Sequence, residues 1–137
     1  MVSIVNSLDE YSALDLDDWE IRAGGTDFQE RLGLGLTASS IVDLGDPCHL
    51  DGFDESFQEI GARVSINCIA NEVKVKQQYP ALSLAAGALA TPMIRNRATL
   101  AGNLLQRSRC FYYRHPFLRC YRSGGDSCPA RDGDQHY

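Results

Sequence analysis

The sequence has no hydrophobic run of membrane-spanning length, which argues against a transmembrane helix. Residues 1–6 lack the basic residues and apolar stretch of a signal peptide. We therefore expect a cytoplasmic location, with export alongside a signal-bearing partner left open. Five cysteines, an odd number, argue against a disulfide framework. No internal repeat is present, and no segment offers a convincing catalytic acid, base or nucleophile.

What the chain does contain is typical of a small globular protein. It has 137 residues, 44% hydrophobic and 23% charged, enough for one ordinary domain or two very small ones. The net charge of -5 is unevenly spread, with -10 in residues 1–92 and +5 in residues 93–137. The basic end is either a surface for an anion or partner, or it neutralises the acidic part on packing. We favour neutralisation, except at the arginines inside the second motif described next.

Two short stretches carry most of the functional signal: residues 23–27 (AGGTD) and residues 94–103 (IRNRATLAGN). Each places glycine beside a small hydroxyl or amide residue at the end of a hydrophobic run. Such backbone can approach a phosphate closely and turn its N–H groups toward it. Two such loops in one small chain indicate a single extended ligand held from both sides.

The first motif is interpreted as a turn between a strand and a helix. Its backbone N–H groups, with a helix N-terminus behind them, would stabilise a diphosphate, and Thr26 adds a hydroxyl donor. The spacing is neither Gly-x-Gly-x-x-Gly nor a P-loop with its lysine. An ordinary strand-to-helix turn uses the same residues, so that alternative stays open. Asp27 is expected to cap the helix.

The second motif offers Thr99 and Asn103 as side-chain hydrogen-bonding groups, and Gly102 allows close backbone approach. Arg95 and Arg97 are two residues apart, so on a strand they would share a face. They either neutralise phosphate charge or form surface ion pairs.

The hydrophobic pattern predicts an α+β fold. We expect strands at residues 19–23, 40–44 and 57–64, with turns at 15–18 and 45–47. Helices are predicted at residues 7–14, 27–34 and 81–89, the last after a break at Tyr79-Pro80. A further helix is predicted to begin after a Ser65 cap, and its apolar face comprises Ile66, Ile69, Ala70 and Val73. From Thr91 strand and loop are expected, and beyond Gln106 mostly irregular backbone. A small β-α-β unit thus precedes the start of a second subdomain, with the change near residues 45–56.

Three cysteines of the basic segment are spaced ten and eight residues apart: Cys110, Cys120 and Cys128. Thiolates on loop-rich backbone near positive charge suit a metal centre, and reduced, unliganded thiols are the alternative. Cys68 is expected to be a core residue. The histidines have no evident metal-ligand spacing.

Together, the two motifs resemble the FAD-binding (medium) subunit of molybdenum hydroxylases of the xanthine and carbon monoxide dehydrogenase type. The resemblance runs along nearly the whole chain, including residues 7–10, 42–44 and 60–62, and is strongest to the aldehyde/xanthine dehydrogenase branch with an iron–sulfur insertion. It implies a PCMH-type FAD-binding fold, with FAD-binding subdomains at 1–48 and 49–106 and the cysteine-containing insertion or tail at 107–137.

The resemblance implies FAD as cofactor, bound at the diphosphate and adjoining parts by both loops. The residues so implied are Ile21, Arg22, Ala23, Gly24, Gly25, Thr26, Asp27, Phe28, Thr99, Leu100, Ala101, Gly102 and Asn103. One position departs from the family, which commonly has Gly-Gly-Asn where this chain has Ala-Gly-Asn. Alanine disfavours positive φ, so affinity should fall only if position 101 needs that geometry.

The same resemblance implies that Cys110, Cys120 and Cys128 belong to the insertion that holds a [4Fe–4S] cluster, although a full cluster normally takes four ligands. It further implies partners: a large subunit with the molybdenum cofactor and a small [2Fe–2S] subunit. Electrons would pass through those centres to FAD and on to an external acceptor. Because the family's subunit is roughly twice as long, a C-terminally truncated subunit is expected. The alternatives are a non-flavin cysteine-containing metal or partner-binding module, and an inactive remnant.

Overall fold

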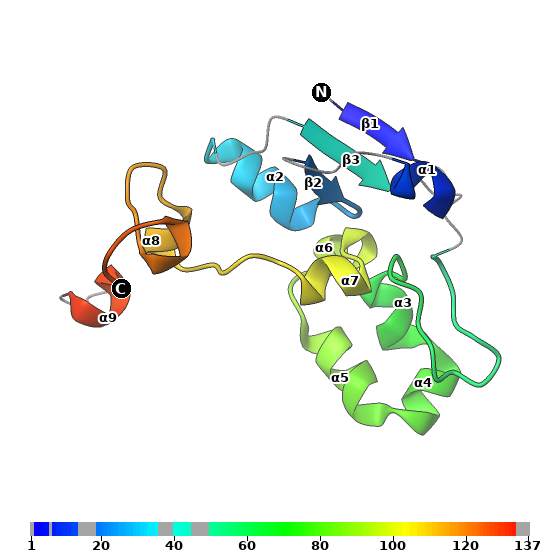
Figure 1. Cartoon of the computed structure of the whole chain (residues 1–137). Helices are drawn as coiled ribbons and strands as arrows, with labels where there is room; N and C mark the ends of the chain where they lie inside the picture. Colours follow the sequence, from blue (N-terminus) through cyan, green and yellow to red (C-terminus); the bar gives the residue numbers. More distant parts are fainter. Residues whose placement is uncertain (1, 6, 14–18, 36–39, 45–49, 134–137) are drawn as a thin grey trace. The chain divides into compact units, whose positions relative to one another are not determined.

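The computed structural model describes residues 2–5, 7–13, 19–35, 40–44 and 50–133. The chain divides into two compact units (Figure 1). The first unit comprises residues 1–26 and 38–105, and the second comprises residues 27–37 and 106–137. The three-part division at residues 48 and 106 stays a prediction about domain boundaries.

The first unit contains a parallel three-stranded sheet in the order β1-β3-β2, built from β1 (Val2–Val5), β2 (Trp19–Arg22) and β3 (Ser40–Leu44). Val2 lies opposite Ile41, and Trp19 lies opposite Ser40. The strands predicted at 19–23 and 40–44 are confirmed, whereas β1 was not predicted. Val5 and Val42 form the buried centre of this sheet, with Tyr11, Trp19, Leu44 and Leu50 packed around them.

Two helices alternate with these strands along the chain, as the sequence predicts. Helix α1 (Leu8–Ser12) begins after Ser7, whose hydroxyl accepts a hydrogen bond from the N–H of Glu10 at 3.1 Å. Helix α2 (Thr26–Gly33) follows directly from the double glycine. The turns predicted at 15–18 and 45–47 lie outside the described residues.

The strand predicted at residues 57–64 is wrong. Phe57 has φ of +60°, which a strand does not allow, and only a single bridge joins Phe53 to Ile60. The Asp54 carboxylate accepts hydrogen bonds from the N–H groups of Ser56 and Glu59 at 2.9 and 2.6 Å. This side chain therefore satisfies backbone donors that a sheet would otherwise use, and the segment forms turns.

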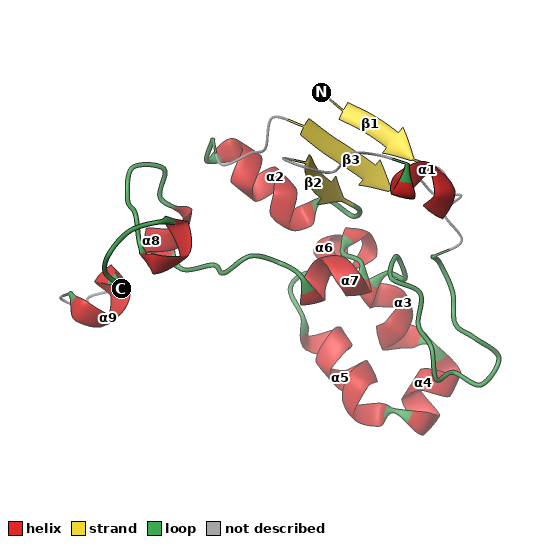
Figure 2. Cartoon of the chain, viewed as in Figure 1, coloured by secondary structure: helices red, strands yellow, loops and turns green. Residues whose placement is uncertain are grey.

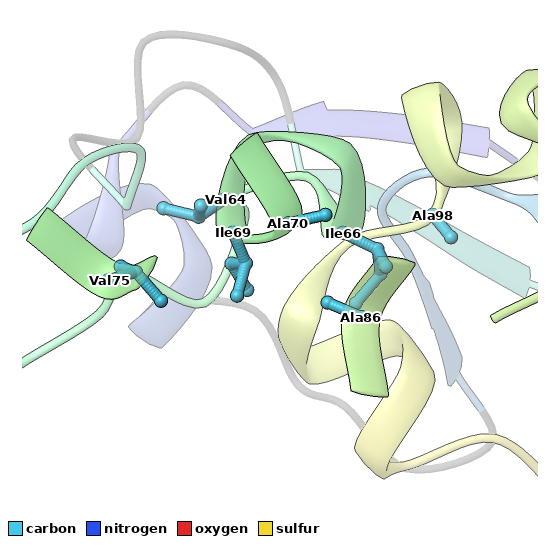
Figure 3. Packing of buried hydrophobic residues seen from close by; sticks show 7 residues of the cluster. All are labelled: Val64, Ile66, Ile69, Ala70, Val75, Ala86 and Ala98. Carbon is cyan, nitrogen blue, oxygen red and sulfur yellow. The ribbon is translucent and has the colours of Figure 1, made fainter. Parts of the chain in front are cut away.

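Helices α3 (Ile66–Asn71), α4 (Val73–Gln78) and α5 (Pro80–Ala88) build the larger core of the first unit. Figure 2 shows how helices dominate this part of the chain, and Figure 3 shows the buried side chains that meet there. Ile69 and Val75 are fully buried. The Ser65 cap is confirmed by its bond from the N–H of Cys68. Val73 was wrongly placed on the apolar face: it is 61% exposed, because Glu72 ends α3 and starts a new helix.

Residues 91–104 form two helices, α6 (Pro92–Arg97) and α7 (Leu100–Leu104), so the predicted strand is wrong. Thr91 and Thr99 each accept a hydrogen bond from an N–H three residues on, and Pro92 fits the first helical turn. Arg95 and Arg97 therefore do not share a strand face. Arg95 instead donates from Nη1 to the carbonyls of Leu89 and Ala90, at 2.9 Å each.

The second unit contains most of α2 and three short helical segments: α8 (Phe111–Arg114), the 3-10 helix η2 (Tyr121–Ser123) and α9 (Pro129–Asp132). The backbone between them is irregular, as expected beyond Gln106. Among the described residues, none of the helices combines the length and the apolar character that crossing a bilayer requires.

Candidate functional site

The first motif joins β2 to α2 through Gly24 and Gly25, and the two glycines serve different purposes. Gly25 has φ of +74°, a conformation that glycine adopts at little cost. Gly24 lies against the second motif, since a Cβ atom built on it would fall 1.8 Å from the carbonyl oxygen of Arg97 and 3.3 Å from the Cα of Ala98. The absence of a side chain at Gly24 is what allows this contact.

The structure thereby brings the two sequence motifs together within the first unit. At Gly24, segments that are about seventy residues apart in the sequence come close through backbone atoms. Arg22, just before the glycines, pairs through Nη2 with the Asp43 carboxylate at 2.8 Å, which ties β2 to β3. The point of contact is therefore fixed on both sides by regular structure.

The second motif is held by the segment before α3. The carbonyl of Ala98 accepts from the N–H of Ile66 at 2.9 Å, and the N–H of Leu100 donates to Val64 at 2.9 Å. Thr99 is 7% exposed, and its hydroxyl accepts from the N–H of Gly102 at 3.2 Å. A Cβ on Gly102 would lie 2.8 Å from that hydroxyl oxygen. A side chain at residue 102 would therefore displace the Thr99 hydroxyl.

Ala101, the departure from the family pattern, lies within α7. Its N–H donates to the carbonyl of Ala62 at 3.0 Å, and Ala101 is not among the described non-glycine residues with positive φ. Alanine is the best helix former, so this position carries no backbone strain. The geometry supports the alternative in which only Gly102 needs to be glycine.

The remaining residues implied in cofactor binding have varied surroundings. Ile21 is 52% exposed, Phe28 is buried at 7%, and Leu100 packs against the larger core. Ala23 is partly buried, Thr26 is the first residue of α2, and the N–H of Asn103 donates to the carbonyl of Thr99. Whether each of them touches a cofactor stays a prediction.

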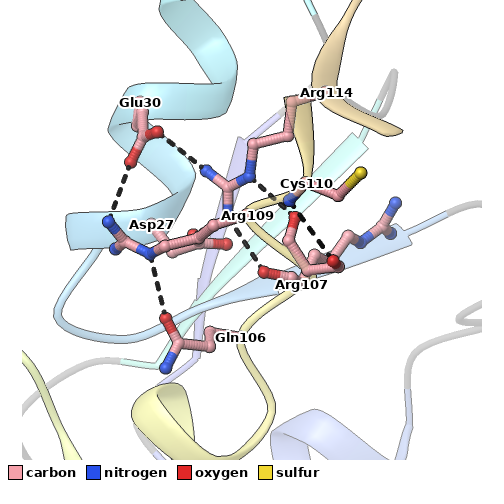
Figure 4. Close-up of polar contacts among 8 residues, drawn as sticks. Asp27, Glu30, Gln106, Arg107, Arg109, Cys110 and Arg114 are labelled. Atoms are coloured by element: carbon pink, nitrogen blue, oxygen red, sulfur yellow. Dashed lines mark hydrogen bonds and ion pairs between the residues drawn. The ribbon is translucent and has the colours of Figure 1, made fainter. Parts of the chain in front are cut away.

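Asp27 is the second residue of α2, so it does not occupy the expected cap position. Its carboxylate pairs instead with Arg114, within the second unit, at 2.5 Å between Oδ1 and Nη2. Arg114 also pairs with Glu30 (Figure 4). Sequence reasoning missed Arg114, although the opposite charges of the two chain parts favoured mutual neutralisation of this kind. No spacing in the sequence singles it out among the arginines of the basic segment.

The three cysteines of the second unit each precede a short helical segment. Cys110 precedes α8, Cys120 precedes η2, and Cys128 precedes α9. The hydrogen bond that Ser123 Oγ donates to Cys120 Sγ at 3.6 Å lowers the pKa of that thiol. Across the described residues, no three side chains of His, Cys, Asp or Glu are placed to hold a metal ion. The cysteines as placed do not form a cluster site, and their assignment to one stays a prediction.

Cys68 is exposed rather than in the core, because α3 turns its Ile66, Ile69 and Ala70 side inward and Cys68 lies on the other face. Cys48 lies outside the described residues.

Replacing Thr99 with valine is expected to lower the free energy of unfolding by about 1 kcal/mol, because the buried cap of α7 is lost while the side-chain shape is kept. The matched control is Thr91→Val, which removes an exposed cap with a longer 3.4 Å bond and should cost about half as much. Urea unfolding followed by circular dichroism measures both. Equal losses in the two variants would contradict the importance of the buried cap.

Residues 2–121 match the protein family described as the FAD-binding domain in molybdopterin dehydrogenase, and the chain belongs to this family. It is 37% identical over 102 residues to the aldehyde oxidoreductase FAD-binding subunit PaoB of Escherichia coli (strain K12). The aligned residues cover 74% of this chain and 29% of that protein. It is 33% identical over 91 residues to the nicotine 6-hydroxylase medium subunit of Paenarthrobacter nicotinovorans, covering 64% of this chain and 32% of that protein.

Among solved structures, carbon monoxide dehydrogenase from Hydrogenophaga pseudoflava, in a form that lacks the Mo-pyranopterin moiety of its cofactor, matches with a TM-score of 0.67 and 27% identity. The match covers 75% of this chain and 38% of that chain. The expected family, its FAD cofactor and the α+β fold class are confirmed by these similarities. The chain spans only 29% and 32% of the curated relatives' lengths.

Proposed function

We propose that this chain holds the diphosphate of FAD between the two motifs, at residues 21–28 and 99–103, as part of an electron-transfer subunit. The observation that carries the proposal is the backbone contact of Gly24 with Arg97 and Ala98, which joins the motifs in one place. Glycine-rich backbone followed directly by a helix N-terminus suits a diphosphate. The residues present therefore fit the group.

Within this proposal, the chain binds and orients the cofactor and does no acid–base chemistry of its own. Gly25 and Thr26 offer backbone N–H groups at the first turn of α2, where helix geometry leaves donors without an intrahelical partner. Thr99 and Gly102 shape the opposite side through their mutual hydrogen bond. FAD, when bound, supplies the exchange between two-electron and one-electron transfer.

We further propose, from the names of the relatives and the family, that the subunit works in a molybdenum-cofactor oxidoreductase. Its partners would be a large subunit with the molybdenum cofactor and a small subunit with [2Fe–2S] centres, and an external acceptor would take the electrons from FAD. Family membership favours this function over a non-flavin metal-binding module. The [4Fe–4S] cluster at the cysteines and the cytoplasmic location stay predictions.

A titration of the purified chain with FAD, followed by flavin fluorescence, tests the proposal. Gly102→Ala is expected to weaken FAD binding by about tenfold, because its Cβ displaces the Thr99 hydroxyl. Ala101→Gly is the matched control and should leave the Kd within about twofold, since residue 101 is already helical. A chain that binds no FAD, or a larger loss at position 101 than at 102, would contradict the proposed site.

A further inference from the structure

A buried guanidinium, that of Arg114, joins the cysteine-containing segment to the first turns of α2. Arg114 is 5% exposed, and all its described partners lie in the second unit. Its Nε donates to the carbonyl of Ser108 and its Nη2 to that of Arg107, both at 2.9 Å. Figure 4 shows the same guanidinium facing two carboxylates of α2.

Those carboxylates are three residues apart and share one side of α2. Asp27 Oδ1 lies 2.5 Å from Nη2 of Arg114, and Glu30 Oε1 lies 3.1 Å from Nη1. The Asp27 side chain is only 15% exposed, so water screens it weakly, while that of Glu30 is 46% exposed. Without Arg114, a half-enclosed pair of negative charges would stand at the start of this helix.

The start of α2 is also where an anionic ligand is expected. Asp27 follows Gly25 and Thr26 directly in the chain, in the motif that we propose binds the FAD diphosphate. A carboxylate favoured by the helix dipole competes with a phosphate for the same backbone donors and repels it. A cation that pairs with the carboxylate reduces both the competition and the repulsion.

We propose that Arg114 is a positioning residue for FAD: it neutralises the carboxylates of Asp27 and Glu30, which follow the diphosphate-binding turn directly in the chain. The inference rests on the proposed function. It gives the basic segment a role in flavin binding that does not require a metal at its cysteines. Arg114 links this segment to α2 through Asp27 and Glu30, and Arg109 adds an exposed pair with Glu30 at 3.6 Å.

The test uses FAD titration of the full chain and a rescue. Arg114→Gln is expected to raise the Kd for FAD by about tenfold to a hundredfold. Adding Asp27→Asn to that variant should return the Kd to within about threefold of the original, because the more buried carboxylate is gone and Glu30 still pairs with Arg109. The control Arg109→Gln, whose side chain is 61% exposed, should change the Kd less than about threefold.

Different results are expected if Arg114 only holds its segment in place and has no effect on the charge near FAD. In that case the double variant stays as weak as Arg114→Gln, and this outcome overturns the inference, as does an unchanged Kd in the single variant. If Arg114→Gln fails to fold, Arg114→Lys replaces it, because lysine keeps the charge but not the forked bonds to the two carbonyls. If Arg114 acts through its charge, Arg114→Lys should keep a Kd for FAD near the original while residues 107–114 are cleaved faster by a protease. A Kd raised tenfold or more in Arg114→Lys overturns the inference. An original chain that binds no FAD instead contradicts the proposed function itself.

Discussion

Gly24→Ala is expected to destabilise the first unit by about 3 kcal/mol or more and to abolish FAD binding. A methyl group at residue 24 would lie 1.8 Å from the Arg97 carbonyl oxygen and 2.8 Å from its carbon. Both are backbone atoms, so no side-chain rotation relieves the overlap, and one motif must move away from the other. Urea unfolding is followed by the fluorescence of Trp19, the single tryptophan, which lies in β2, the strand that leads to Gly24.

The control for this variant is Gly87→Ala in α5, also in the first unit. A Cβ there meets only the Ala70 methyl at 4.0 Å, an ordinary contact, and the position is helical. The change should be neutral or stabilise by up to about 1 kcal/mol through helix propensity. Similar losses at Gly24 and Gly87 would show that the contact between the motifs does not hold the unit together.

Local signals in the sequence were sufficient for part of the fold. The strands around Trp19 and Val42, the Ser65 cap and the helix that follows the break at Tyr79-Pro80 all rest on neighbouring residues, and the structure confirms them. These features form through contacts within a few residues, which a pattern along the chain records directly.

The errors arise where a side chain competes with the expected backbone bonds. The Asp54 carboxylate accepts hydrogen bonds from two N–H groups of the segment predicted as a strand. Thr91 and Thr99 cap helices where strand was expected. β-branched and apolar residues fit either state in short runs, so the outcome depended on these polar groups. Threonine followed by proline or by a small-residue run was the available signal for helix.

The candidate site shows a similar boundary between what was predictable and what was not. Both motifs could be found in the sequence from their glycines. The reason why residue 24 must be glycine could not be found there, because it depends on contact with Arg97, which is 73 residues later in the chain. Arg114 was not found because its partners Asp27 and Glu30 are 87 and 84 residues away. Pairings of such separation leave no periodic trace in one sequence.

The second large effect is expected at Ile69, where replacement by alanine should lower the free energy of unfolding by about 2 to 5 kcal/mol. Ile69 is fully buried between α3 and its neighbours, so the change leaves a cavity that the packed helices fill only in part. Urea unfolding followed by far-UV circular dichroism measures the loss, because these helices dominate the signal.

Val73→Ala separates the two interpretations of this helical region. Sequence periodicity placed Val73 on the same apolar face as Ile69, whereas the break at Glu72 leaves it 61% exposed at the start of α4. Alanine also has the higher helix propensity, so the variant should unfold within about 0.5 kcal/mol of the original. A loss comparable with that of Ile69→Ala would mean that α3 and α4 form one continuous helix with Val73 in the core. Val75→Ala, like Ile69→Ala, is expected to lower the free energy of unfolding, because the break at Glu72 places Val75 rather than Val73 in the core.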